Sequence, residues 1–184
     1  RIKRSSCKEL LAITKGDEKT WDIYAKGLTC LVNQVDGEGT KAKAMKYKPQ
    51  SYSELSAFVA AIRPGFKSNY SKFEKREPFS YGIPALDNLL QTPAFPYSYM
   101  LYQEQTMAVL NYAGIPMDEC YDVIKAISKK KVDKIRKVKD RFFNGFAEKL
   151  RFEDSTLTSD RITMIIEQAW TVIIDSARYS FNAS

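Results

Sequence analysis

The sequence predicts a mainly α, multi-helix protein with at most one or two short strands near its N-terminus. Apolar residues recur at helical spacing through most of the 184-residue chain, so each such segment presents one apolar face. Gly and Pro separate these segments, at positions where helices usually end. We expect one continuous domain, although a chain of this length can also support two small cores.

The N-terminal part of the chain is predicted to contain short helices and one strand. Residues 6–14 and 19–26 have helical spacing. The second of these segments has Asp17 as its N-cap and Gly27 at its C-cap position. Residues 29–35 are rich in β-branched side chains, which favour a strand.

Two more helices and a long irregular region follow. Helices are expected at residues 39–46 and 51–62, and the second opens with the capping-box pattern Ser-x-x-Glu. Residues 66–98 contain several prolines and few long apolar patterns. We expect an irregular loop region there, with one short helix at residues 85–90.

The second half of the chain is predicted to consist of longer helices. They are expected at residues 99–112, 118–127 and 131–150, with a last helix that opens at residues 157–160. The helix at 131–150 is amphipathic and has an apolar face formed by Ile135, Val138, Phe142, Phe146 and Leu150. The last helix has an apolar stripe formed by Ile162, Ile165, Ile166, Ala169, Trp170 and Ile173. Both faces are expected to pack into a core.

The composition excludes several classes of function. The chain has no histidine, which rules out Ser-His and Cys-His nucleophile pairs and His-based zinc sites. Cys7, Cys30 and Cys120 are far apart and fit neither a disulfide framework nor a Cys-x-x-Cys site. No apolar run approaches the ~20 residues of a membrane span, so we expect a soluble, cytoplasmic protein with no membrane partner. The formal net charge of +7 favours a polyanionic partner.

The densest positive charge lies between Lys125 and Arg141, where nine of seventeen residues are Lys or Arg and two are acidic. Like charges at this density repel unless a polyanion or solvent relieves them, and phosphate backbones are the commonest such polyanion. We therefore predict that this stretch, including Lys134, Lys137 and Arg141, contacts nucleic acid or nucleotide phosphate, and that contacts with a backbone would not read its sequence. A solvated helix face is the alternative.

Three further patterns bear on chemistry. Residues 102–105 (Tyr-Gln-Glu-Gln) indicate an ordinary helix N-terminus when they are taken alone. Arg63 stands at a helix end, where an arginine can satisfy terminal carbonyls. Nucleotidyl transfer with two Mg²⁺ ions needs closely placed acids, usually in an Asp-x-Asp pattern, and this sequence contains no Asp-x-Asp. We expect no catalytic residue and no metal site in this chain.

Six motifs together resemble one known family. They lie at residues 17–27, 53–65, 75–78 (Lys-Arg-Glu-Pro), 101–107 (Leu-Tyr-Gln-Glu-Gln-Thr-Met), 126–131 (Ala-Ile-Ser-Lys-Lys-Lys) and 178–184 (Arg-Tyr-Ser-Phe-Asn-Ala-Ser). Their order and spacing resemble the region after the palm in the alpha subunit of bacterial DNA polymerase III, a family C replicative polymerase. In that family the region is the end of the palm and the helical fingers.

The resemblance implies a fingers region of a DNA-directed DNA polymerase that closes over the incoming deoxynucleoside triphosphate. The residues implied to lie toward the triphosphate or the template-primer are Arg63, Lys129, Lys130 and Lys131. Those implied to line the nucleotide side of the cleft are Tyr102, Gln103, Glu104 and Gln105. Arginine and lysine clamps of this kind neutralise charge on transferring phosphoryl oxygens.

The resemblance also implies partners and a division of the chain. Residues 1–50 are expected to be the end of the palm or its connection, and residues 51–184 the helical fingers. The implied partners are template-primer DNA, deoxynucleoside triphosphate, the palm and thumb domains, and other replisome subunits. Mg²⁺ is expected in a full-length enzyme, bound by palm aspartates that precede the matched region, so this chain alone is expected to be inactive. We expect it to be a piece of a longer protein.

The sequence departs from the family pattern at three positions. Ser128 stands where the family has Gly before the three lysines, Phe66 where it has a second Pro, and Ala183 where it has Lys. Two rival interpretations remain: a non-enzymatic helical nucleic-acid-binding module that uses residues 125–141, and a protein-interaction domain with a solvated basic face. Salt-dependent binding of nucleic acid would separate these two rivals.

Overall fold

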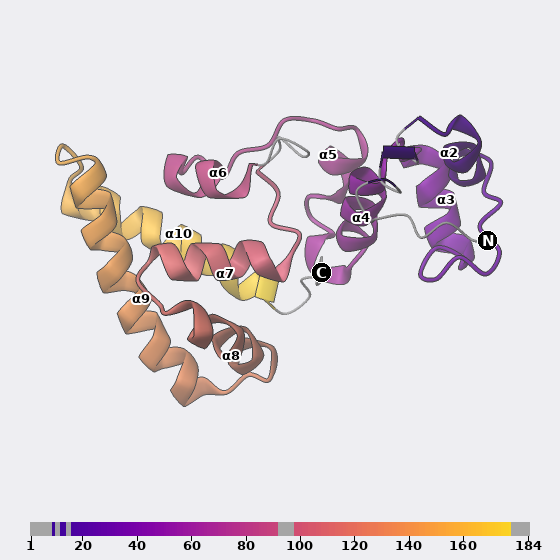
Figure 1. The fold of residues 1–184 in the computed structure, drawn as a ribbon. Helices are drawn as coiled ribbons and strands as arrows, with labels where there is room; N and C mark the ends of the chain where they lie inside the picture. The colour runs from indigo at the N-terminus through magenta and orange to yellow at the C-terminus, as the bar shows by residue number, and fades with distance from the viewer. Residues whose placement is uncertain (1–8, 10–11, 14–15, 92–97, 178–184) are drawn as a thin grey trace. The chain divides into compact units, whose positions relative to one another are not determined.

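The computed structural model describes residues 9, 12–13, 16–91 and 98–177. The elements within these ranges are helices, so the predicted mainly α fold is confirmed (Figure 1). They are α2 (Glu18–Ala25), α3 (Glu38–Tyr47), α4 (Tyr52–Ala61), the 3-10 helix η1 (Pro64–Phe66), α5 (Tyr70–Glu74), α6 (Pro84–Leu90), α7 (Gln103–Tyr112), α8 (Met117–Ser128), α9 (Val132–Glu153) and α10 (Ser159–Ala177). No described helix combines the length and the apolar character that crossing a membrane requires.

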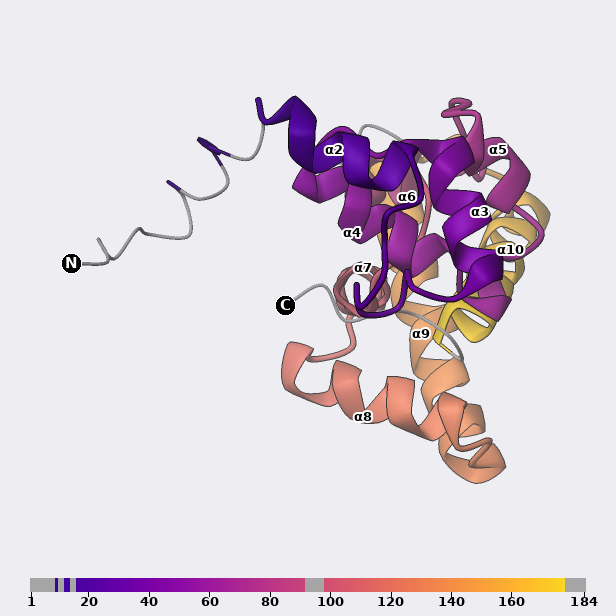
Figure 2. The same ribbon diagram turned by 90° about the vertical axis from the view of Figure 1, so that its right-hand side faces the viewer.

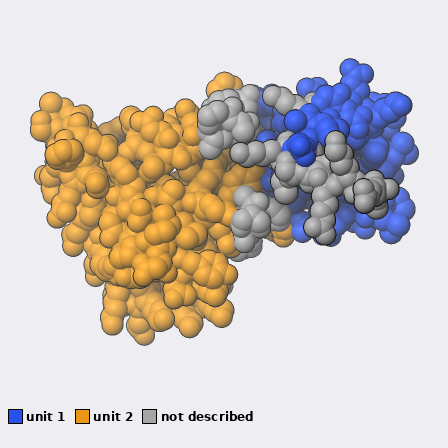
Figure 3. Space-filling view, in the orientation of Figure 1, with its two compact units in different colours: residues 1–62, 67–77 blue, residues 63–66, 78–184 orange. Residues whose placement is uncertain are grey.

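The chain divides into two compact units (Figure 3). Unit 1 comprises residues 1–62 and 67–77, and therefore contains α2 to α5. Unit 2 comprises residues 63–66 and 78–184, and contains η1 and α6 to α10. The division at residue 50, expected from the family resemblance, concerns roles within a polymerase and stays a prediction.

Aromatic rings form the centre of unit 1. The ring of Tyr47, at the end of α3, stacks on Phe58 of α4 and on Phe73 of α5, with centroid distances of 5.5 and 4.9 Å. All three side chains are buried. Burial of such large rings supplies most of the apolar stabilisation that a unit of this size can gain.

Arg76 fastens the helix ends around this stack. Its guanidinium group donates to the carbonyl oxygens of Tyr47 (3.0 Å) and Lys48 (3.1 Å), where α3 ends. It also forms an ion pair with the Glu54 carboxylate at 2.9 Å and lies 4.4 Å from the centroid of the Tyr47 ring. Because the last carbonyls of a helix have no partner within the helix, Arg76 acts as a C-cap for α3 supplied from a distant segment.

Unit 2 is built on α7, α8, α9 and α10, which pack against one another (Figures 1 and 2). The predicted apolar faces pack into the core. On α9, Phe142, Phe146 and Leu150 are buried and Ile135 and Val138 are partly buried. All six residues of the predicted stripe on α10 are buried. The Phe142 ring stacks on Phe146 at 5.4 Å and lies 5.2 Å from Trp170 of α10.

Gly145 allows the closest approach between elements of this core. A Cβ atom at Gly145 in α9 would lie 2.0 Å from the carbonyl oxygen of Ala113, the residue after α7. No side chain fits at that distance, because such a contact is far inside van der Waals separation. The glycine therefore sets how closely α9 packs on the end of α7.

Three sequence-based expectations differ from the structure or fall outside the described residues. The strand predicted at residues 29–35 is wrong: Leu31 and Gln34 have φ angles of 63° and 65°, and such left-handed residues interrupt an extended chain. Within the described residues 66–91 there are two helices where one was expected, because α5 forms in addition to α6. The helix predicted at residues 6–14 falls largely outside the described residues.

Candidate nucleic-acid interface

The three consecutive lysines, Lys129, Lys130 and Lys131, form the turn between α8 and α9. We call these residues the lysine turn. The amide of Lys130 donates to the Ile127 carbonyl oxygen (3.0 Å) and that of Lys131 to the Ala126 carbonyl oxygen (2.9 Å). This pair of bonds is typical of a helix that ends with a left-handed residue, and it fixes the turn on the end of α8.

Lys130 is the left-handed residue of this turn, with a φ angle of 52°. Glycine is the usual residue at such a position, because a Cβ atom makes this backbone conformation unfavourable by about 1 kcal/mol. The two backbone hydrogen bonds that close the turn offset part of this cost. Strained positions of this kind are concentrated at functional sites.

The basic face predicted on α9 forms as expected, but its members have different surroundings. Lys134, Lys137 and Arg141 are exposed and spaced three and four residues apart, so they share one face of the helix. The Arg141 guanidinium is paired with both carboxylate oxygens of Glu119 of α8, at 2.6 and 3.3 Å. The hydrogen bond from Arg141 lowers the pKa of Glu119, and the same bond raises the pKa of Arg141. The predicted role of Arg141 at a DNA backbone therefore requires it to exchange this partner, and it stays a prediction.

Two further lysines of the basic stretch lie over aromatic rings. The Lys125 ammonium is 4.3 Å from the centroid of Tyr121, and that of Lys139 is 5.0 Å from the centroid of Phe143. In contrast, no described residue forms an ion pair with the lysine turn, Lys134 or Lys137. Arg136 is also exposed and has no ion pair or aromatic partner among the described residues, so these five ammonium groups and Arg136 are the uncompensated part of the stretch.

Gln105 has a different role from its neighbours. Its side-chain oxygen accepts from the amides of Leu101 (2.8 Å) and Tyr102 (2.9 Å). Its amide nitrogen donates to the carbonyl oxygens of Leu90 (3.3 Å) and Tyr99 (3.1 Å). The side chain therefore joins the end of α6, the extended residues 98–101 and the start of α7, and its two hydrogens and two oxygen lone pairs are all engaged.

The other residues implied by the resemblance lie at the ends of helices in unit 2. Tyr102 is the N-cap of α7, and Gln103 and Glu104 are its first two residues. Arg63 precedes η1, and its carbonyl oxygen accepts from the Phe66 amide at 3.1 Å. Arg63, Tyr102 and Glu104 each have an interaction partner within the protein. Their contact with a nucleotide stays a prediction.

Comparison with known proteins identifies the family. Residues 2–150 match the family described as the bacterial DNA polymerase III alpha subunit finger domain. The chain belongs to this family. Its relatives include the DNA polymerase III alpha subunits of Aquifex aeolicus, 32% identical over 95% of this chain, Ureaplasma parvum (29%, 96%) and Bacillus subtilis (28%, 96%). The chain spans 14%, 17% and 15% of the length of these three proteins.

Two residues of the family motifs form contacts between distant segments that the sequence did not reveal. Arg76, from the motif at residues 75–78, caps α3 and pairs with Glu54. Ser128, which stands where the family resemblance predicts Gly, donates its hydroxyl to the Ala177 carbonyl oxygen at 2.7 Å. The motif at residues 178–184 lies outside the described residues.

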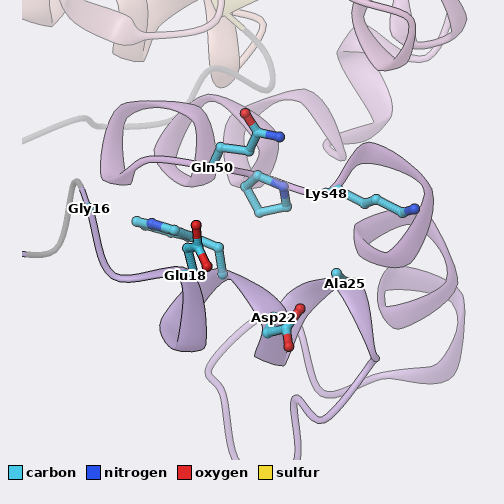
Figure 4. A pocket seen from close by; sticks show the side chains of 8 residues that line it. Gly16, Glu18, Asp22, Ala25, Lys48 and Gln50 are labelled. Atoms are coloured by element: carbon cyan, nitrogen blue, oxygen red, sulfur yellow. The ribbon is translucent and has the colours of Figure 1, made fainter.

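A hollow of about 550 Å³ opens in unit 1 of the finger domain (Figure 4). Its lining comes from residues 16–25 and from residues 48–50, and includes Trp21, Glu18, Asp22 and Lys48. Acidic and basic groups are mixed there, so the hollow does not select one charge of ligand. The residues predicted to bind phosphate or nucleotide are absent from this lining.

Metal chemistry has no evident site in the described part of the finger domain. No group of three or more Asp, Glu or Cys side chains there is placed to hold a metal ion. Glu153 instead accepts a hydrogen bond from the Tyr112 hydroxyl, and Asp154 accepts from the Thr156 amide at 2.9 Å. These carboxylates stabilise helix ends and turns, so no metal-dependent step can be assigned to them.

Proposed function

We propose that this chain serves as the fingers of a DNA-directed DNA polymerase. In this proposal the lysine turn, Lys134 and Lys137 neutralise phosphates of template-primer DNA and of the incoming deoxynucleoside triphosphate. The observation that carries it is the set of five exposed ammonium groups without a counter-ion in the described part of the chain. A polyanion relieves repulsion among such groups, and the counterions that it releases favour binding.

The spacing of these groups suits a nucleic-acid backbone. Residues 131 to 137 rise about 9 Å along the axis of α9, and phosphates on one strand of DNA follow one another at about 3.4 Å along its axis. The surface therefore matches roughly three consecutive phosphates. Contacts of this kind fix position and orientation and are independent of base sequence.

The remaining parts of the reaction are assigned to other regions of the polymerase. We propose that Mg²⁺ is held by carboxylates of the palm, and that the palm, the thumb and other replisome subunits are partners of this chain in the cytoplasm. On this basis the isolated chain should bind primed DNA without extending the primer.

Fluorescence anisotropy of labelled primed-template DNA tests this role directly. The chain is titrated at several salt concentrations, and the variant Lys130→Glu/Lys131→Glu is compared with Lys149→Glu/Arg151→Glu. Both variants change the net charge equally and alter exposed residues near opposite ends of α9. We expect the first to lose at least tenfold in affinity at 100 mM salt and to reduce the slope of log K against log salt by about 2.

Each outcome has a clear meaning. Equal weakening by the two variants would show that net charge, and not the lysine turn, governs binding. Absence of binding by the unaltered chain at low salt would remove DNA contact as a property of this surface. In a polymerase that contains the chain, unchanged nucleotide incorporation by Lys130→Glu/Lys131→Glu would contradict the triphosphate role.

A further inference from the structure

The hydroxyl of Ser128 makes a contact that the proposed phosphate chemistry does not require. Ser128 is the last residue of α8, and it donates a 2.7 Å hydrogen bond to the carbonyl oxygen of Ala177, the last residue of α10, 49 positions along the chain. The final carbonyls of a helix have no partner within that helix. The serine hydroxyl therefore joins the end of α8 to α10.

This hydrogen bond lies beside a well-packed contact. α8 and α10 pack against each other, and Ala126, Ile127 and Ala177 are 5%, 2% and 2% exposed. A hydrogen bond depends on the angle at its hydrogen as well as on distance, so it adds a directional contact to the interdigitated packing of the two helices. The Ser128 hydroxyl thus adds an orientation constraint at the last turn of α8.

The lysine turn begins immediately after this constraint. Lys129 follows Ser128 directly, and the two backbone bonds that close the turn are accepted by Ile127 and Ala126, in the same last turn of α8. The turn also contains Lys130 at a positive φ angle of 52°. A strained residue holds its geometry only where its surroundings over-determine it.

We propose that Ser128 is a positioning residue, whose hydrogen bond to Ala177 fixes the end of α8 so that the ammonium groups of the lysine turn engage phosphates together. This inference rests on the proposed function, because it assigns the lysine turn to phosphate binding. Ser128 itself does not contact the phosphate. It acts through the backbone that carries Lys129, Lys130 and Lys131.

A series of side chains at position 128 tests the role of the hydroxyl. Ser128→Thr keeps the hydroxyl donor, Ser128→Cys offers a weaker donor of similar size, and Ser128→Ala removes it. The full chain is titrated against labelled primed-template DNA at several salt concentrations. We expect Ser128→Ala to bind three- to tenfold more weakly and with a shallower salt slope, Ser128→Thr to match the unaltered chain, and Ser128→Cys to lie between them.

Thr171→Ala is the matched control. The Thr171 hydroxyl donates to the Glu167 carbonyl oxygen at 2.9 Å, which is also a hydroxyl-to-carbonyl bond in α10, but one within a single helix. This variant should bind DNA with unchanged affinity and salt slope. A loss of binding shared by Thr171→Ala and Ser128→Ala would assign the effect to general loosening of α10 and overturn the proposal.

The two hypotheses fail in different ways. If the unaltered chain binds and Ser128→Ala binds with the same affinity and slope, the positioning role is wrong and the phosphate role stands. If the unaltered chain does not bind DNA at low salt, the phosphate role fails, and the positioning role fails with it. A Ser128→Ala variant that proves unfolded leaves the comparison of Ser128→Cys with Ser128→Thr, and equal binding by those two would overturn the proposal.

Discussion

Units 1 and 2 are stabilised by different kinds of interaction. In unit 1 a charged side chain, Arg76, lies over the aromatic stack and fastens the end of α3 to Glu54. In unit 2 the core is formed by apolar packing around Phe142 and Trp170, and the ion pair between Arg141 and Glu119 lies at the surface. The uncompensated lysines lie on unit 2, whose core does not depend on charge. We therefore expect that these lysines can be substituted while the fold that presents them is kept.

The two tryptophans of the chain allow the units to be followed separately. Trp21 lies in unit 1 and Trp170 in unit 2, and the sequence contains no others. Urea unfolding followed by fluorescence in Trp170→Phe and Trp21→Phe backgrounds therefore reports unit 1 and unit 2 respectively. The effects of Gly145→Ala, Arg76→Ala and Lys130→Gly on stability can be measured in this way.

The largest effect is expected for Gly145→Ala in unit 2. The added methyl group would meet the Ala113 carbonyl oxygen at 2.0 Å, so α9 and the end of α7 must separate. We expect the free energy of unfolding of unit 2 to fall by roughly 3 kcal/mol, as is typical of severe overpacking, with unit 1 unchanged.

Gly39→Ala is the control for this prediction. Gly39 lies within α3, and a Cβ atom there would meet nothing within 4 Å. Alanine should stabilise unit 1 by up to about 1 kcal/mol, because it favours the helix. Destabilisation of both units by Gly145→Ala would show that they unfold together. The stabilities of units 1 and 2 could then not be compared separately.

A smaller loss is expected for Arg76→Ala in unit 1. The variant removes two bonds to backbone carbonyls and the ion pair with Glu54. We expect the free energy of unfolding of unit 1 to fall by about 2 kcal/mol, since bonds to charged groups contribute more than neutral ones. The difference from the unaltered chain should narrow in 1 M salt, which screens the ion pair, whereas the effect of Gly145→Ala should not.

Lys75→Ala provides the matched comparison for Arg76→Ala. Lys75 is adjacent in sequence and forms a 3.7 Å pair with Glu77, and its side chain is 66% exposed. Its removal should change the stability of unit 1 by no more than about 0.5 kcal/mol. Equal effects of the two substitutions would mean that Arg76 contributes only net charge.

The smallest effect has opposite signs for stability and for binding. Lys130→Gly relieves a residue with φ of 52° and should stabilise unit 2 by about 0.5 kcal/mol, yet it should weaken DNA binding and reduce the salt slope by about 1. Lys48→Gly is the control in unit 1, where Lys48 ends α3 with φ of 50°. It should give a similar stabilisation without loss of binding. If Lys130→Gly binds DNA as tightly as the unaltered chain, neither the ammonium group of Lys130 nor its strained backbone has a role in phosphate contact.

Most helices could be predicted because their signals are local. Asp17 accepts from the Lys19 amide at 3.2 Å and Ser51 from the Glu54 amide at 3.2 Å, as their cap patterns indicate. The strand predicted at residues 29–35 could not be tested against local sequence alone. β-Branched side chains tolerate an extended chain, but a strand needs a partner, and the Thr29 hydroxyl instead closes a loop by donating to the Val35 carbonyl oxygen at 2.8 Å.

The candidate site was only partly predictable. The density of charge at residues 125–141 and the periodicity of α9 identified Lys134 and Lys137 as members of one exposed face. The bond from Gln105 to the Leu90 carbonyl oxygen and the pairing of Arg141 with Glu119 depend on segments that lie 15 and 22 residues away in the sequence. No local pattern distinguishes these engaged side chains from the unpaired lysines beside them.

By itself, then, the sequence determined the helical fold, the apolar faces and the location of the excess positive charge, because these follow from residue type and spacing along one helix. Only the tertiary structure decided which charges are neutralised, where Arg76 and Ser128 join distant helix ends, and how closely Gly145 brings α9 to α7. The physical reason is that ion pairs, capping bonds and close contacts depend on distances between atoms of separate segments, and those distances are set when the segments pack.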